Sequence, residues 1–268
     1  MDLEQKRLWL FDVDNTLVRD IEHPEVFPDA LNLWNHLESL GRTNAILTNV
    51  GRLSSRQIHS TLTQAGFSLT RDRTFGAGAA AAAYVFNRSP GARCFVISEG
   101  GATEDFVARG LNVTNNPPVE YVAVAADRGL TFQELNFATK MVQDGATLIC
   151  VSGSLKYGGV YLGNEDVFIG ERSIVTAIEH ATGVEAVVVG KPMPEIFVET
   201  VTVLGFEVRD AVMVGDNPHS DIAGGNAAGM TTILVNHSRS SDEVSDPRGL
   251  DTKPDFSVSS LDEIVALL

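Results

Sequence analysis

Short, uninterrupted runs of apolar residues recur along the chain and alternate with segments of helical periodicity. Residues 8–11 are apolar at every position, which is typical of a strand buried on both faces of a parallel sheet. Similar runs occur at residues 45–47, within residues 185–192, and at residues 211–214 and 231–235, and helical spacing lies between them at residues 28–41 and 193–205. This alternation predicts an α/β fold with a doubly wound, mostly parallel, Rossmann-like core sheet.

A second α/β series interrupts the first. Its expected strands lie at residues 93–98, 121–127 and 147–152, and an expected helix at residues 131–145 begins with a capping box formed by Thr131 and Glu134. We therefore predict an inserted α/β domain at residues 77–185 between two parts of the core, residues 1–76 and 186–268. Residues 156–170 are rich in glycine and are expected to be loop and turn, and the polar stretch 238–254 is expected to be a surface excursion.

The glycine- and alanine-rich stretch GAGAAA at residues 76–81 has two interpretations. It fits the start of a dinucleotide-binding fingerprint, but the preceding residues 69–74 lack the apolar character of a buried strand. A hinge between the core and the inserted domain explains the small residues better.

Composition limits the partners. Forty-four per cent of the 268 residues are hydrophobic, which is enough for a proper core, and the formal net charge is −15. Such a charge argues against nucleic acid or an anionic membrane as the main partner, because both attract basic patches. The two cysteines lie in apolar strand-like runs and are expected to be buried and reduced. No stretch has the apolar length of a signal peptide or membrane span, so a cytoplasmic location is expected.

Four of the apolar runs end in polar residues that could act together. The residues concerned are Asp12 and Asp14, Thr48 and Asn49, Lys191, and Asp216 followed by Asp221. If all four runs belong to one parallel sheet, their carboxyl ends share an edge and these side chains converge. Taken singly, each has an ordinary explanation, since Asp14 or Asp216 can cap a helix, Lys191 can be solvated, and proline after it can begin a helix.

Together these residue types suit phosphoryl transfer. Oxygen ligands from Asp12, Asp14 and Asp216, a backbone carbonyl among them, are what Mg²⁺ prefers, and such an ion lets an acidic protein hold a phosphate. Asp12 is the candidate nucleophile, since a carboxylate attacking phosphorus gives an acyl phosphate that water can hydrolyse. Asp14 is the candidate general acid toward the leaving oxygen and general base toward that water.

The remaining candidates assist this chemistry. Lys191 would offset the charge on Asp12 and the phosphoryl oxygens, and Thr48 and Asn49 would donate hydrogen bonds to the phosphoryl group. Asp221 and Asn217 would orient their neighbours from behind the reacting groups.

These residues carry a resemblance to a known family. DVDNT (12–16), LTN (47–49), GKP (190–192) and GDNPHSDI (215–222) resemble the four ordered motifs of the haloacid dehalogenase superfamily. The insert between the second and third motifs is similar to the large cap of class IIA members, a group of nitrophenyl, phosphoglycolate and nucleotide phosphatases. The resemblance implies a Mg²⁺-dependent phosphatase that acts on a small-molecule phosphate ester through an aspartyl phosphate. A homodimer formed through the cap is also predicted.

The chain departs from the family pattern at several positions. Asn15 stands where class IIA usually has glycine, Val50 where a second asparagine is common, and Ser220 where threonine is usual. Within the insert, SGSLKYGG (152–159) and GERS (170–173) replace the usual cap motifs. Candidate cap contacts to a leaving group are Asp127, Arg128, Lys156, Tyr157, Glu171 and Arg172, and His219 is expected in an exposed loop.

Two alternatives stay open. The same nucleophile could serve another transfer, such as phosphonate or carbon–halogen cleavage. A non-catalytic phosphoacceptor or ligand sensor also gathers acids, a threonine and a lysine at strand ends. The paired acids Asp12 and Asp14 and the large insert count against a sensor, which needs neither a general acid nor a cap.

Overall fold

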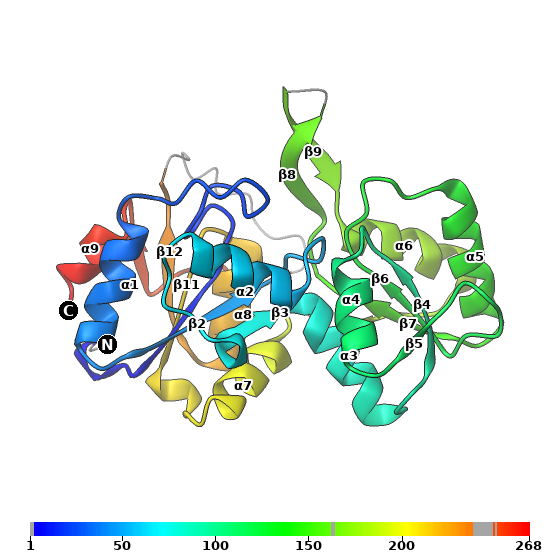
Figure 1. Cartoon of the computed structure of the whole chain (residues 1–268), viewed down its shortest axis with the longest axis horizontal. Helices are drawn as coiled ribbons and strands as arrows, with labels where there is room; N and C mark the ends of the chain where they lie inside the picture. The colour runs from blue at the N-terminus through cyan, green and yellow to red at the C-terminus, as the bar shows by residue number, and fades with distance from the viewer. Residues whose placement is uncertain (1–2, 162–163, 238–248, 250) are drawn as a thin grey trace. The chain divides into compact units, whose positions relative to one another are not determined.

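The structure is a computed structural model of the whole chain, and it describes residues 3–161, 164–237, 249 and 251–268. The chain divides into two compact units (Figure 1). The first unit comprises Met1–Thr48, Ile58–Phe75 and Lys191–Leu268, and the second comprises Asn49–Gln57 and Gly76–Gly190. The expected division placed residues 49–57, Gly76 and residues 186–190 in the core, whereas here they cluster with the second unit.

The first unit is built on a six-stranded sheet whose order is β13-β12-β11-β1-β2-β3. These strands are β1 Leu8–Phe11, β2 Thr43–Thr48, β3 Thr74–Gly76, β11 Ala211–Gly215, β12 Thr231–Val235 and β13 Phe256–Val258. The pairs β1 with β2, β1 with β11, β11 with β12 and β12 with β13 are all parallel. The chain winds outward from β1 through β2 to one edge and from β11 through β13 to the other. The boundary between β1 and β11 is therefore a topological switch point, where α/β proteins bind ligands.

Helices cover this sheet as the sequence pattern predicts. They are α1 Ala30–Ser39, α2 Ser55–Gln64, α7 Pro194–Val203, α8 Ala223–Ala228 and α9 Asp262–Val265. Helix α1 packs with α9, and α7 packs with α8. On α1 the leucines at helical spacing, Leu33 and Leu37, are fully buried, whereas Leu40, just beyond the end of the helix, is exposed. Burying each such leucine contributes about 1.5–3 kcal/mol.

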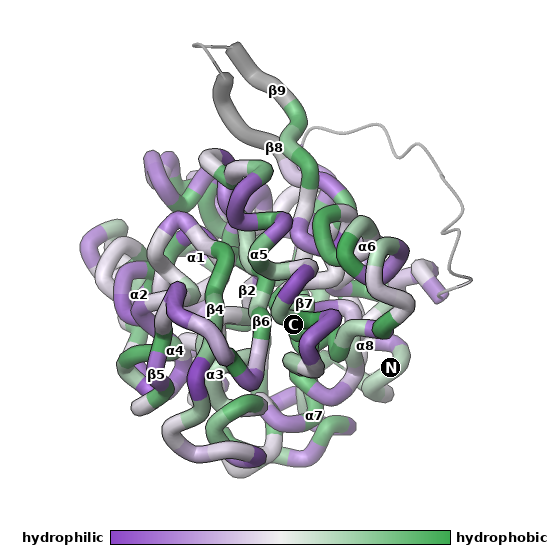
Figure 2. The backbone as a smooth tube through the Cα atoms, turned by 90° about the vertical axis from the view of Figure 1, so that its right-hand side faces the viewer, coloured by the Kyte–Doolittle hydropathy of each residue, from purple (hydrophilic) through white to green (hydrophobic). Residues whose placement is uncertain are grey.

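The second unit has its own parallel sheet of order β10-β7-β6-β4-β5. Its strands are β4 Arg93–Ile97, β5 Asn112–Val113, β6 Tyr121–Val124, β7 Thr147–Cys150 and β10 Val187–Val188, and its helices are α3 Ala77–Arg88, α4 Gly101–Ala108, α5 Phe132–Gln143 and α6 Glu171–Thr182. Alternate strand residues pack on opposite sides, so one core joins the sheet to α3 and α4 and another joins it to α5 and α6. Figure 2 shows hydrophobic colouring along β6 and β7 among more hydrophilic outer segments.

Several local predictions for the second unit are confirmed, and one is wrong. Thr131 and Glu134 form the expected capping box at α5. Both cysteines are buried and free. Residues 156–170, expected as loop and turn, instead contain an antiparallel hairpin of β8 Lys156–Tyr161 and β9 Asn164–Ile169. Glycines in a two-stranded ribbon carry no side-chain signal, so the alternation that marks a strand was lost at these positions.

The stretch at residues 76–81 begins a helix. Thr74–Gly76 forms the short strand β3, and α3 follows immediately, with Ala77, Ala81 and Ala82 buried. Gly78 lies so close to α4 that a Cβ there would stand 3.1 Å from Ala102 Cα and 2.8 Å from Asp105 Oδ2. These small residues therefore serve close helix packing, and the division between the units falls between Phe75 and Gly76.

Two further observations complete the fold. No helix in the described part of the chain is both long and apolar enough to cross a membrane. Most of the stretch 238–254, expected as a surface excursion, lies outside the described residues.

Candidate active site

Two of the expected acids lie at the switch point of the first sheet. Phe11 pairs with Val214, and the Asp12 backbone N–H continues the ladder to Val214 O at 3.0 Å. Asp12 therefore leaves β1 where the neighbouring β11 ends at Gly215, and Asp216 follows directly. The buried apolar strands fix the backbone of both acids, so their carboxylates emerge at the same edge.

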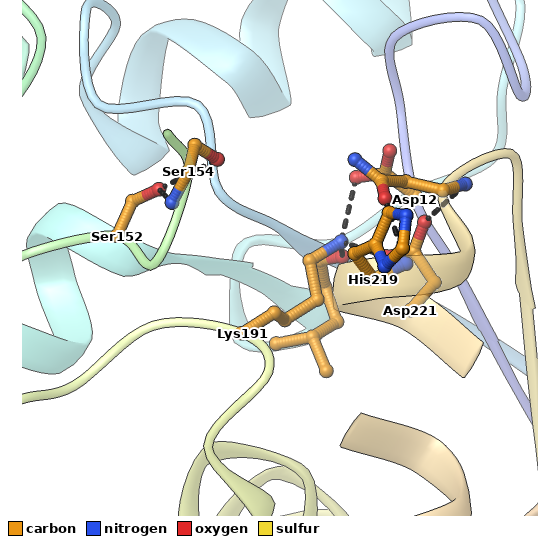
Figure 3. Close-up of polar contacts among 8 residues, drawn as sticks. Asp12, Ser152, Ser154, Lys191, His219 and Asp221 are labelled. Atoms are coloured by element: carbon orange, nitrogen blue, oxygen red, sulfur yellow. Dashed lines mark hydrogen bonds and ion pairs between the residues drawn. The ribbon is translucent and has the colours of Figure 1, made fainter. Parts of the chain in front are cut away.

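Lys191 reaches this edge from outside the sheet. The strand before it, β10, pairs with β7 of the second unit's sheet, so the expectation that all four polar strand ends share one sheet was wrong for Lys191. The long side chain nevertheless brings Nζ to Asp12 Oδ1 at 2.8 Å, to Asp221 Oδ1 at 2.6 Å and to Leu47 O at 2.9 Å (Figure 3). Convergence therefore depends on a side chain rather than on strand order.

The ammonium group of Lys191 is completely surrounded. The side chain is 1% exposed, and its two carboxylate partners are 12% and 0% exposed. Burial alone lowers the pKa of a lysine, but the charges and hydrogen bonds of Asp12 and Asp221 outweigh it, and the pKa of Lys191 is raised. Lys191 is therefore a fixed cation beside Asp12.

Asp221 is held by a tight turn after β11. Burial, together with the nearby charge of Asp12, raises the pKa of Asp221 to about 6 against the lowering effect of Lys191. Its Oδ1 accepts from Lys191, and its Oδ2 accepts from the Asn217 backbone N–H at 3.1 Å. A Cβ added at Gly215 would stand 2.3 Å from Asp221 Oδ2, so only glycine permits this approach.

Three acids form a group that could hold a metal ion. Carboxylate oxygens of Asp12, Asp216 and Asp221 lie within 4.8 Å of one another. Three carboxylates against one ammonium leave two negative charges in excess, which a divalent cation would balance, and an all-oxygen donor set suits Mg²⁺. Because both oxygens of Asp221 are already hydrogen-bonded, Asp12 and Asp216 are better placed as ligands, and Asp221 as the anchor of Lys191.

Asp14 is not one of these three acids. Among the described residues, the group whose carboxylate oxygens lie within 4.8 Å of one another consists of Asp12, Asp216 and Asp221, so a metal-binding role of Asp14 stays a prediction. Asp14 Oδ1 accepts a hydrogen bond from the Ile21 backbone N–H at 2.8 Å. Asn15, next to it, has a φ of 57°. Asparagine is one of the few residues other than glycine that adopt this left-handed conformation readily.

The remaining residues expected near the site lie at the end of β2, in the second unit and on the turn after β11. Thr48 ends β2 and is 1% exposed, and it lies two residues beyond Ile46, the partner of Phe11. Asn49 belongs to the second unit, where its Oδ1 would meet a Cβ added at Gly190 at 2.7 Å. The exposed Asn217 accepts from the His219 N–H and so caps the π-helical turn Pro218–Ile222. His219, half-buried, lies on the same turn as Asp221 (Figure 3).

A polar cluster inside the second unit includes an arginine that sequence reasoning missed. Arg52 lies with its guanidinium carbon 5.1 Å from the centre of the Tyr157 ring. Glu171 is 3% exposed, and burial raises its pKa to about 7 although Arg52 and a hydrogen bond from Ser152 lower it. Arg52 follows Asn49 by three residues in a glycine-containing loop, which is a weak signal because arginines are common in surface loops.

Other expected contacts of the second unit are occupied by internal partners. Arg128 donates to both carboxylate oxygens of Glu99, and Arg172 pairs with Glu179 at 2.9 Å. Asp127 accepts from the Gly129 backbone N–H at 2.7 Å. Tyr157 stacks on Phe168 within the hairpin. Burial raises the pKa of both Tyr157 and Glu171, and the charge of Arg52 lowers it.

Comparisons with known proteins agree on one family. Residues 9–112 match the family described as haloacid dehalogenase-like hydrolase, and residues 188–264 match the HAD-hydrolase-like family. The chain is 28% identical to an acid sugar phosphatase of Staphylococcus aureus over 270 residues, covering 99% of both chains. It also resembles a p-nitrophenyl phosphatase from Archaeoglobus fulgidus, with a TM-score of 0.87, 26% identity and coverage of 98% and 99%. A thermostable double mutant NPPase from Geobacillus stearothermophilus gives a TM-score of 0.83, 28% identity and coverage of 97% and 98%.

Proposed function

Because the chain belongs to the haloacid dehalogenase superfamily and is a phosphatase of its class IIA, we propose that it hydrolyses small-molecule phosphomonoesters with Asp12 as nucleophile and Mg²⁺ as cofactor. The single observation that carries the residue assignment is the buried contact of Lys191 with Asp12 and Asp221. Burying a lysine is unfavourable unless well-placed carboxylates pair with its ammonium group, as Asp12 and Asp221 do here.

The first step transfers the phosphoryl group to the protein. A carboxylate oxygen of Asp12 attacks phosphorus while the bond from phosphorus to the ester oxygen breaks. Asp14 enters this step protonated and gives its proton to the departing oxygen, so an alcohol leaves. Lys191, held at 2.8 Å from Asp12, orients the nucleophile and offsets the charge gathered around it.

The second step returns the protein to its starting state. Asp14, now a carboxylate, takes a proton from water as the water attacks the phosphorus of the acyl phosphate. The bond between phosphorus and the Asp12 oxygen breaks, and inorganic phosphate leaves. We assign Thr48 and Asn49 as hydrogen-bond donors to the phosphoryl oxygens, and Asp221 as the residue that positions Lys191.

The case for Mg²⁺ rests on the group of carboxylate oxygens as a whole and not on one residue. Asp12 and Asp216 would hold Mg²⁺, which when bound would neutralise charge on the substrate's phosphoryl oxygens.

We further propose that the second unit acts as a cap that selects the leaving group, with Arg52 and Tyr157 among its contacts. A sugar phosphate, phosphoglycolate or a nucleotide are the candidate substrates, and the S. aureus relative favours testing sugar phosphates first. The homodimer expected through this unit stays a prediction.

The test is turnover of p-nitrophenyl phosphate with and without EDTA, followed by a screen of the candidate substrates. The proposal expects EDTA-sensitive turnover that Asp12→Asn abolishes. Unchanged turnover in Asp12→Asn would refute the nucleophile assignment. Phosphorylation without turnover would point to a phosphoacceptor instead.

A further inference from the structure

The loop that carries Asp14 folds back on itself within the first unit. Backbone hydrogen bonds run from Phe27 N to Leu17 O at 3.1 Å and from Arg19 N to Glu25 O at 2.9 Å, and Val18 bridges Val26 in antiparallel fashion. These contacts make a small hairpin between β1 and α1. Its inner side is firmly packed, since Leu17, Val18 and Ile21 are at most 1% exposed.

This hairpin orients the carboxylate of Asp14. The Ile21 backbone N–H donates to Asp14 Oδ1 at 2.8 Å, and Asp14 also bridges Val18 through its backbone. The position of the Asp14 carboxylate is therefore set by the hairpin as well as by β1. A displacement of the hairpin would move the carboxylate even with Asp12 unmoved.

His237 links the hairpin to the segment that follows β12. It follows β12 by two residues, and the neighbouring Asn236 N–H bonds Val258 O of β13 at 2.9 Å, so its backbone is fixed. Its Nε2 lies 3.2 Å from Thr16 O, and because a carbonyl oxygen only accepts, Nε2 carries the proton. Its ring stacks on Phe27 with centroids 3.9 Å apart and planes inclined by 11°.

Resting on the proposed function, we propose that His237 is a positioning residue that holds the Asp14 hairpin in register for proton transfer to the leaving group. The two contacts lie at the two ends of the hairpin, at Thr16 directly before Leu17 and at Phe27, the pairing partner of Leu17. The role differs from that of Lys191 and Asp221, which hold Asp12.

This role has a kinetic signature because leaving groups differ in their need for a proton. Nitrophenolate departs from phosphorus without protonation, whereas an alkyl oxygen requires an acid. The kcat/KM value reports events up to formation of the acyl phosphate. Misplacing Asp14 therefore lowers kcat/KM for an alkyl phosphomonoester much more than for p-nitrophenyl phosphate, while damage to phosphate binding or folding lowers both equally.

The experiment compares kcat/KM of His237→Ala for p-nitrophenyl phosphate and for an alkyl phosphomonoester that the wild-type enzyme hydrolyses. A general acid contributes about 10²–10⁴-fold, so partial misplacement should cost about 10–100-fold with the alkyl ester and less than about 3-fold with the aryl ester. His237→Gln, which keeps an N–H donor, should recover part of the loss. Asp14→Asn gives the limit of the effect.

His59→Ala is the matched control. His59 places Nε2 3.1 Å from Leu69 O in the same unit, and this contact touches neither the hairpin nor the acids. Its removal should cost comparable stability and leave the ratio of the two kcat/KM values unchanged. If His237→Ala does not fold, Phe27→Leu, which removes the stacking on His237 together with the contact of Arg19 with the same ring, should show the same bias at smaller size.

The outcomes distinguish a failure of the proposed function from a failure of the positioning role of His237. A wild-type enzyme that hydrolyses neither ester overturns the proposed function. A wild-type enzyme that hydrolyses both, together with His237 and Phe27 variants that lose both activities equally or lose neither, overturns the positioning role alone.

Discussion

Replacing Lys191 by methionine isolates the interaction on which the active-site geometry depends. Methionine keeps the length and apolar stem but removes the three hydrogen bonds from Nζ to Asp12, Asp221 and Leu47 O, which span 2.6–2.9 Å. Asp221, fully buried, is then left beside Asp12 without a counter-charge. Removing one partner of a buried ion pair costs about 3–5 kcal/mol, and we expect that loss in the free energy of unfolding at pH 8.

The double variant Lys191→Met with Asp221→Asn tests whether the unpaired charge of Asp221 causes the loss of stability. Asparagine removes the uncompensated charge, so about 2 kcal/mol of stability should return although the hydrogen bonds to Lys191 are still missing. Turnover of p-nitrophenyl phosphate should stay at least about 10²-fold below wild type in both variants, because the cation beside Asp12 is gone.

The chain offers a probe confined to the first unit. Both of its tryptophans, Trp9 and Trp34, are fully buried there. Urea unfolding followed by tryptophan fluorescence, in EDTA, therefore reports the stability of the unit that contains Lys191. A loss below about 1 kcal/mol in Lys191→Met, or a double variant no more stable than the single one, would contradict the reasoning.

Three further predictions follow from single residues. Gly215→Ala should displace Asp221, because the new Cβ would lie 2.3 Å from Oδ2, and should lower kcat by at least about 10-fold; an active variant with unchanged tryptophan-detected stability would contradict this. Burial raises the pKa of Glu171 from 4.5 to about 7, so the folded state holds its proton more tightly and stability falls by up to about 3 kcal/mol as pH rises through that interval. Glu171→Gln should abolish this fall. The unfolding free energies of both proteins would be measured by calorimetry at pH 5 and pH 8, and an equal loss of stability in the two proteins would contradict the prediction. At Asn15, with φ 57°, glycine should be tolerated and valine should cost about 1–2 kcal/mol by urea unfolding; equal stability of the two would remove the conformational argument.

Local signals in the sequence predicted much of the fold. The wholly apolar residues 8–11 and 211–214 do form neighbouring buried parallel strands, and Thr131 with Glu134 caps α5 as expected. Such features depend on short-range chemistry that a few adjacent residues contain. The meeting of Asp12 with Asp216 followed from the rule that parallel strands share their carboxyl edge.

The sequence-based predictions failed or were incomplete where contacts between distant segments determine the structure. Residues 187–188 have the apolar character of any buried strand, and only pairing with β7 assigns them to the second sheet. The Ile21 N–H donates to Asp14 Oδ1, a contact that depends on the fold of the loop after β1 and not on the residues next to Asp14. Arg52 and His237 acquire partners only through folding, and nothing in their immediate sequence distinguishes them.

The most direct test of the central claim is detection of a phosphoryl group on Asp12. Asp14→Asn should form the acyl phosphate from p-nitrophenyl phosphate, whose leaving group needs no proton, and should hydrolyse it slowly because the general base is missing. Acid quenching during turnover, followed by peptide mass spectrometry, should find the added mass of one phosphoryl group on the peptide containing Asp12 and none in Asp12→Asn. Turnover that continues without any such adduct, or an adduct on another residue, would contradict the account.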